Sequence, residues 1–81
     1  MNNFGKFKKE IPEWVARHRK KSGLSQEQLA KLAGVGKTAV FDVEHGKMTI
    51  QMDTLLRILD ALNIEVQLSS PLLQAQKEKQ K

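Results

Sequence analysis

The stretch Ser25-Gln-Glu-Gln-Leu-Ala-Lys-Leu-Ala-Gly-Val-Gly-Lys-Thr-Ala-Val-Phe-Asp-Val-Glu-His-Gly46 contains two short helical patterns separated by a glycine turn. Ser25 and Gln28 have the spacing of a capping box, in which each side chain bonds the backbone N–H of the other residue. Gly34 ends the first pattern, because glycine adopts the left-handed conformation without a clash at Cβ. The second pattern runs from about Lys37 to Gly46. Two such helices joined by a tight turn predict a helix-turn-helix.

Apolar side chains at helical spacing predict which helix faces form a core. Five of them share the inner faces of the two helices: Leu29, Leu32, Ala33, Val40 and Val43. Residues 51–62 continue the same periodicity and are predicted to form another helix. Its stripe is expected to add five more core side chains: Met52, Leu55, Leu56, Leu59 and Leu62.

One more helix is expected before Ser25. We predict that it begins at Pro12, because the missing N–H of proline is not needed at the first helical position. His18 lies on its inward side and is interpreted as a buried or half-buried core histidine, not as a ligand. Residues 1–10 are expected to form a basic N-terminal arm, either flexible or loosely docked.

Beyond the last helix the periodicity changes from that of a helix to that of a strand. Apolar and polar side chains alternate over five residues: Ile64, Glu65, Val66, Gln67 and Leu68. This alternation predicts a half-exposed β-strand within residues 63–70. A lone strand leaves its backbone groups unpaired and attracts another chain, so we expect it to pair with the same segment of a second copy. A further helical turn or a disordered tail is the alternative, and residues 71–81 are expected to be a flexible basic tail.

Positive charge is concentrated near the N-terminus. Residues 1–22 hold seven of the 14 Lys and Arg residues but two of the nine Asp and Glu residues, and the chain has a net charge of +5. A basic end on a nearly neutral body suits a polyanion such as DNA. A solvated surface without a partner explains the charge equally well, so the helix-turn-helix pattern decides in favour of DNA.

The residue inventory argues against several other classes of protein. The chain has no cysteine and two isolated histidines, and it lacks a Gly-rich phosphate loop and a spaced nucleophile–base pair. We therefore expect no enzyme activity, no cofactor and no metal site. No apolar run approaches the roughly 18 residues of a membrane span, and no signal peptide opens the chain. These absences predict a cytoplasmic protein with no membrane partner.

The segment from Ile11 to Leu62 resembles the helix-turn-helix of phage repressors, Cro proteins and related small bacterial regulators. The resemblance is carried by Gly23-Leu24-Ser25-Gln26, by the Ala-Gly-Val turn and by Val43-Glu44-His45-Gly46-Lys47. The ending Leu62-Asn63-Ile64-Glu65-Val66-Gln67-Leu68 is similar to that of HipB-type antitoxins. The resemblance implies an all-α, lambda-repressor-like bundle of four to five helices within residues 11–62. It also implies one short C-terminal β-strand that pairs across a homodimer.

The resemblance also implies which residues face DNA. Eight positions at and around the third helix would do so: Gln26, Gly36, Lys37, Thr38, Ala39, Phe41, Asp42 and Lys47. Lys37 can donate to guanine, and Phe41 could touch a thymine methyl group. In the family pattern, Arg19 pairs with Glu44 and clamps the first helix to the third.

Three of these residues depart from the commoner family pattern. Gly36 replaces a Ser or Thr cap, Phe41 replaces a polar residue, and Asp42 replaces a residue often able to donate a hydrogen bond. Such departures leave the fold intact and bear on how bases are read. A protein-interaction module that binds DNA weakly is therefore one alternative function.

By resemblance, the chain is expected to be a repressor that binds a palindromic operator in double-stranded DNA as a homodimer. A HipB-type antitoxin would repress its own operon and bind a HipA-like serine/threonine kinase toxin. A stand-alone regulator without a toxin is the other alternative.

Overall fold

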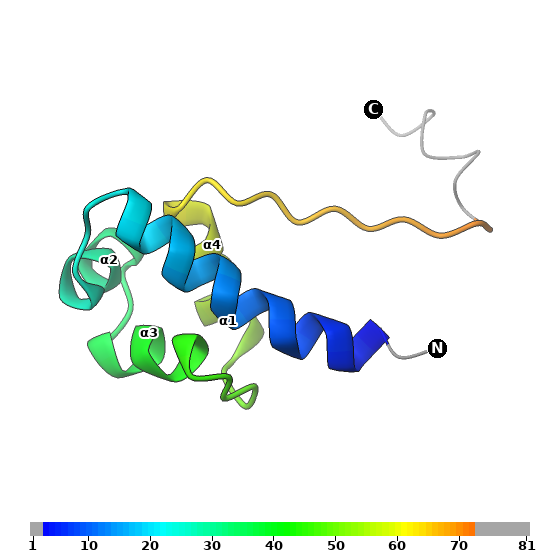
Figure 1. The fold of residues 1–81 in the computed structure, drawn as a ribbon, viewed down its shortest axis with the longest axis horizontal. Helices are drawn as coiled ribbons and strands as arrows, with labels where there is room; N and C mark the ends of the chain where they lie inside the picture. The colour runs from blue at the N-terminus through cyan, green and yellow to red at the C-terminus, as the bar shows by residue number, and fades with distance from the viewer. Residues whose placement is uncertain (1–2, 73–81) are drawn as a thin grey trace.

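The computed structural model describes residues 3–72, which contain four α-helices. They are α1 (Asn3–Lys21), α2 (Gln26–Ala33), α3 (Lys37–Glu44) and α4 (Met52–Ala61). The short helices α2 and α3 pack on each other, α1 runs along α3, and α4 closes the bundle against α2 (Figure 1). The predicted helical bundle is thus confirmed. None of the helices in the described part of the chain is long and apolar enough to cross a membrane.

The core lies where the four helices meet. Nine hydrophobic side chains are buried there: Val15, Leu29, Ala30, Val40, Val43, Leu55, Ile58, Leu59 and Leu62. A fully buried aliphatic side chain contributes roughly 1.5–3 kcal/mol relative to an exposed one. This cluster therefore holds α3 in a fixed position on the rest of the bundle.

Three side chains predicted to be buried are exposed instead. Leu32 is 63% exposed, Met52 68% and Leu56 43%. The buried side of α4 is formed by Leu55, Ile58 and Leu59, so it extends round the helix to Ile58 and stops short of Leu56. In α2 the small residue Ala30 takes the inner position. The periodicity located both helices, but the faces it assigned to these residues were wrong.

The first helix begins at Asn3, so the predicted start at Pro12 was wrong. Residues 3–10 of the predicted arm are helical. Proline interrupts the helical hydrogen-bond ladder, because it lacks an N–H. Two features favour the longer helix: Phe7 and Ile11 lie one turn apart on the face that continues towards the core, and Ile11 packs against the core. The ring of Pro12 faces the turn at Gly46, 4.0 Å from where a Cβ would stand there.

The caps of α2 were predicted from the sequence and are present. The hydroxyl of Ser25 accepts from the N–H of Gln28 at 3.0 Å, and Oε1 of Gln28 accepts from the N–H of Ser25 at 2.8 Å. Gly34 ends the helix with φ = 72°, in the left-handed region. At the start of α3, Gly36 supplies no side-chain cap. The turn between α2 and α3 is therefore fixed mainly from the α2 side.

After α4 the chain leaves the bundle. Asn63 has a positive φ of 59°, and the N–H of Ile64 donates to the carbonyl of Leu59 at 2.9 Å. Residues 64–70 then run outward as an extended chain (Figure 1). The described residues contain no β-strand, as expected when the only partner of a strand would be another molecule. Strand pairing therefore stays a prediction, and residues 73–81 of the predicted tail lie outside the described residues.

Candidate nucleic-acid interface

Helix α3 has one buried and one exposed side. Val40 and Val43 are fully buried, whereas Lys37, Thr38 and Phe41 are exposed. These three exposed residues were predicted to face DNA. Their helix is short and lies on the outside of the bundle (Figure 1). A ligand as wide as a DNA duplex can therefore reach these three side chains.

The other predicted contact residues are not equally available. Gly36 is exposed, but Ala39 is half-buried and packs against the core. Asp42 is also half-buried, and its carboxylate lies 3.9 Å from the Nζ of Lys47. The side chain of Lys47 is 63% exposed, so the attraction is screened by water and is worth about 0–1 kcal/mol. Lys47 therefore offsets part of the negative charge of Asp42 at the C-terminal end of α3.

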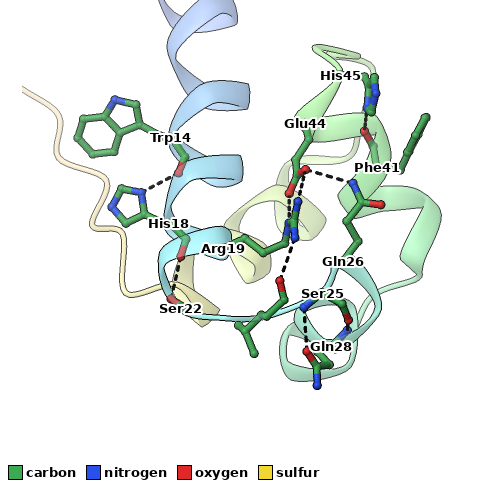
Figure 2. Close-up of polar contacts among 11 residues, drawn as sticks. Trp14, His18, Arg19, Ser22, Ser25, Gln26, Gln28, Phe41, Glu44 and His45 are labelled. Carbon is green, nitrogen blue, oxygen red and sulfur yellow. Dashed lines mark hydrogen bonds and ion pairs between the residues drawn. The ribbon is translucent and has the colours of Figure 1, made fainter.

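Arg19 and Glu44, expected to form an ion pair, join α1 to α3. Nε of Arg19 donates to Oε2 of Glu44 at 2.6 Å, and Nη2 donates to Oε1 at 3.1 Å (Figure 2). A third bond runs from Nη1 to the carbonyl of Leu24 at 2.9 Å. The side chains are 13% and 6% exposed, respectively. This bidentate geometry fixes the C-terminal end of α3 relative to the end of α1.

Gln26 joins the same carboxylate from α2. Its Nε2 donates to Oε1 of Glu44 at 3.1 Å (Figure 2). Gln26 was predicted to face DNA, and its contact with Glu44 was not foreseen. An amide has two N–H donors and one acceptor oxygen, so the bond to Glu44 leaves donor and acceptor capacity for a ligand. Glu44 thus holds α1, α2 and α3 together at one point.

The network sets the charge of Glu44. Burial raises the pKa of this carboxyl group. Hydrogen bonds from Arg19 and Gln26 and the positive charges of Arg19 and Lys20 lower it by more than burial raises it, so the pKa of Glu44 lies below its ordinary value. The hydrogen bond to Glu44 raises the pKa of Arg19, against the opposing effect of burial. Both groups therefore remain ionised at neutral pH, and the pair persists.

Two histidines stack on aromatic rings one turn before them. The ring centroids of Phe41 and His45 are 3.9 Å apart with an interplanar angle of 25°, and those of Trp14 and His18 are 5.5 Å apart at 21°. In each pair Nδ1 lies close to the carbonyl oxygen of the aromatic residue, at 2.8 Å for His45 and 2.6 Å for His18. His18 is half-buried. His45 was not among the predicted site residues, although its spacing of four from Phe41 is the signal that could have found it.

The exposed side of α3 therefore presents two kinds of chemistry. Lys37 and Thr38 offer hydrogen-bond donors in its first turn, and Phe41 offers an apolar ring in its second. A helix of this width fits the major groove of B-DNA, where base edges carry acceptors, donors and the thymine methyl group. The donors of Lys37 and Thr38 and the ring of Phe41 are groups that such base edges can complement.

Comparison with known proteins agrees with this architecture. The sequence profile of the helix-turn-helix family matches residues 15–68. The chain is 38% identical over 53 residues to the uncharacterized HTH-type transcriptional regulator y4mF of Sinorhizobium fredii, a match covering 65% of this chain and 70% of that protein. It is 35% identical over 63 residues to the control protein C.SmaI of Serratia marcescens, covering 78% of this chain and 75% of that protein. With its two short helices, glycine turn and exposed second helix, the chain belongs to the helix-turn-helix family.

Proposed function

We propose that this protein is a sequence-specific DNA-binding regulator of transcription that acts as a homodimer on a palindromic operator. The observation that supports this function most is the exposed side of α3, which carries Lys37, Thr38 and Phe41. The opposite side of the same helix is buried in the core. A relative described as an HTH-type transcriptional regulator is 38% identical to the chain over 53 residues. In this proposal the protein is located in the cytoplasm, together with the DNA that it binds.

Each exposed residue has a role in this proposal. The ammonium group of Lys37 donates to O6 or N7 of guanine, and the hydroxyl of Thr38 donates or accepts at a neighbouring base edge. The exposed backbone at Gly36 and the small side chain of Ala39 permit close approach. Gln26 and Lys47 lie at the two ends of the α2–α3 unit, where they bind phosphates on either side of the groove.

The extended segment 64–70 supplies the dimer contact. Val66 is 51% exposed and Leu68 is 85% exposed, so their apolar side chains lack cover in the single chain. A groove of about 190 Å³ runs between this segment and α1. Its apolar lining comes from six residues: Phe7, Ile11, Trp14, Leu59, Ile64 and Val66. Antiparallel pairing with a second copy would give residues 65–69 backbone hydrogen-bond partners and cover this apolar edge.

Two regulatory settings fit this dimer. In the first, the protein is an antitoxin that represses its own operon and binds a HipA-like serine/threonine kinase toxin, as the resemblance of residues 62–68 to HipB-type antitoxins suggests. In the second, it is a stand-alone regulator, which the 35% identity to a control protein over three quarters of that protein's length favours. Co-expression with the product of the adjacent gene, followed by copurification, separates the two.

A titration against the upstream region of its own gene tests the DNA-binding function. Specific binding by a protein of this kind has a dissociation constant of about 10⁻⁸ M or tighter. We expect Lys37→Ala and Thr38→Ala each to weaken this binding by about tenfold or more, the effect of losing one contact to a base edge, whereas Arg57→Ala, which removes an exposed positive charge from α4, leaves it unchanged. Binding in the micromolar range that does not depend on sequence would overturn the proposal and favour a protein-interaction module.

A further inference from the structure

Phe41 is the large apolar residue on the exposed side of α3. It is 46% exposed and follows the donors of the first turn, Lys37 and Thr38, in the chain. On a face that binds base edges, an exposed aromatic ring is complemented by an apolar group of the DNA. We propose that the stack of Phe41 and His45 reads the C5-methyl group of a pyrimidine in the major groove, an inference that rests on the proposed DNA-binding function.

The ring of Phe41 is held in place before any ligand binds. The imidazole of His45 covers one of its faces at a centroid distance of 3.9 Å. A carbonyl oxygen only accepts hydrogen bonds, so Nδ1 of His45 carries the proton and donates to the carbonyl of Phe41 at 2.8 Å. Phe41 is still 46% exposed with His45 on one face, so the ring has open surface away from His45. His45 is therefore a positioning residue, and the open face of Phe41 is the contact surface.

The chemistry of base edges identifies the ligand. In the major groove the C5-methyl group is the apolar group of a base pair, and the other groups there donate or accept hydrogen bonds. Thymine carries this methyl group, and 5-methylcytosine carries it at the same ring position. The two bases differ in the neighbouring group: thymine has the acceptor O4, whereas cytosine has the donor N4.

Asp42 bears on that difference. Its carboxylate accepts hydrogen bonds and follows Phe41 directly in the helix, and its side chain is 27% exposed. A carboxylate accepts from N4 of cytosine and is repelled by O4 of thymine. Lys47, at 3.9 Å, weakens that repulsion. The shared ligand is thus a pyrimidine C5-methyl group, and Asp42 shifts the preference towards the methylated cytosine.

Methyl substitution in the DNA tests the inference. Starting from an operator selected for tight binding, each thymine is replaced in turn by deoxyuridine and each cytosine by 5-methylcytosine, and dissociation constants are measured by fluorescence anisotropy. At the contacted position we expect loss of the methyl group to weaken binding, or its addition to strengthen it, by about fourfold, the effect of burying one methyl group. A deoxyuridine effect identifies thymine as the source, and a methylcytosine effect identifies the modified base.

Protein variants assign the effect to the stack. The quantity compared is the ratio of affinities for duplexes with and without the C5-methyl group at the contacted position. Phe41→Ala should bring this ratio to about one, whereas Lys37→Ala should weaken binding to both duplexes and preserve the ratio. His45→Ala should lower the ratio, and His45→Phe, which retains a stacked ring, should restore it. The inference is overturned if wild-type protein shows a ratio of one at every position, or if Phe41→Ala keeps the wild-type ratio. Absence of any sequence-specific binding would instead overturn the proposed function.

Discussion

Glu44 accepts hydrogen bonds from Arg19 of α1 and Gln26 of α2, so one carboxylate fixes the mutual position of three helices. The side chains of Arg19 and Glu44 are 13% and 6% exposed, so the pair is largely but not fully shielded from water. Removing one partner of a fully buried ion pair costs about 3–5 kcal/mol. We expect Arg19→Ala to lower the free energy of unfolding by less than this, about 2–3 kcal/mol, measured by urea denaturation. Lys47→Ala removes only an exposed pair and should cost less than about 1 kcal/mol. An equal, small loss in both variants would contradict a structural role for the pair of Arg19 and Glu44.

The same carboxylate predicts how stability depends on pH. The pKa of Glu44 in the folded protein lies below its ordinary value, about 4.3 in the unfolded chain. The unfolded state then binds the proton more readily, so the contribution of Glu44 is fully present above about pH 4.3 and is lost as the pH falls through the folded-state pKa. Urea midpoints between about pH 6 and pH 3 should fall more steeply for the wild type than for Glu44→Gln. Parallel curves would show that other carboxylates cause the acid loss.

Sequence reasoning reached some of these residues and missed others for a physical reason. Ser25 and Gln28 were predictable, because a capping box is a local pattern of four residues. Arg19 and Glu44 were expected from the family pattern and not from their own spacing. The bond from Gln26 to Glu44 depends on how α2 and α3 are oriented, which no local pattern contains.

The start of α3 is an element without a side-chain cap. Gly36 has extended φ and ψ values of −77° and 154°, and a Cβ there would meet nothing within 4 Å. Gly36→Asp should therefore raise the free energy of unfolding by a few tenths of a kcal/mol, because Asp caps a helix slightly better than Gly. The same change should weaken DNA binding, since it adds a negative charge beside the proposed contact with the groove. Thermal denaturation and anisotropy titration of one variant measure both effects, and stronger DNA binding would contradict the proposed orientation of α3.

The helix boundaries show where local rules fail. Pro12 is compatible with a first helical position, so the sequence favoured a start there, yet α1 continues back to Asn3. Ile11 packs on the core and the ring of Pro12 faces Gly46, contacts that the local pattern around Pro12 does not contain. In α4 the periodicity predicted the helix correctly but not the exposure of Met52. An apolar stripe in the sequence does not contain the positions of the neighbouring helices, and these positions determine which of its residues are covered.

For the molecule as a whole, the proposed dimer depends on the apolar edge of residues 64–70. Leu68 is 85% exposed, so Leu68→Asp should leave the fold of the single chain intact. It should convert the dimer to monomer, because a charge cannot be buried at the paired edge without a partner. Gln67→Asp places the same charge on the alternate side of the segment and serves as the matched control. Sedimentation velocity measures both, and an intact dimer for Leu68→Asp would contradict strand pairing.

The net charge of +5 predicts the salt dependence of binding. Each phosphate neutralised by a Lys or Arg releases counterions, so affinity falls steeply with ionic strength. For a dimer that makes several phosphate contacts, raising salt from about 50 to 200 mM should weaken operator binding by about 10³-fold or more. Fluorescence anisotropy at a series of salt concentrations gives the slope. A flat response would show that the basic surface does not touch DNA.

The left-handed conformation of Asn63 has a consequence for the target of the protein. Its φ of 59°, together with the bond from the N–H of Ile64 to the carbonyl of Leu59, turns the chain as it leaves α4. In the proposed dimer, the conformation of Asn63 therefore helps to determine the distance between the two copies of α3. The number of base pairs separating the operator halves is then encoded outside the DNA-contacting helix. A substitution of Asn63 that changes this conformation would then change the operator spacing that the dimer accepts, even with an identical reading surface.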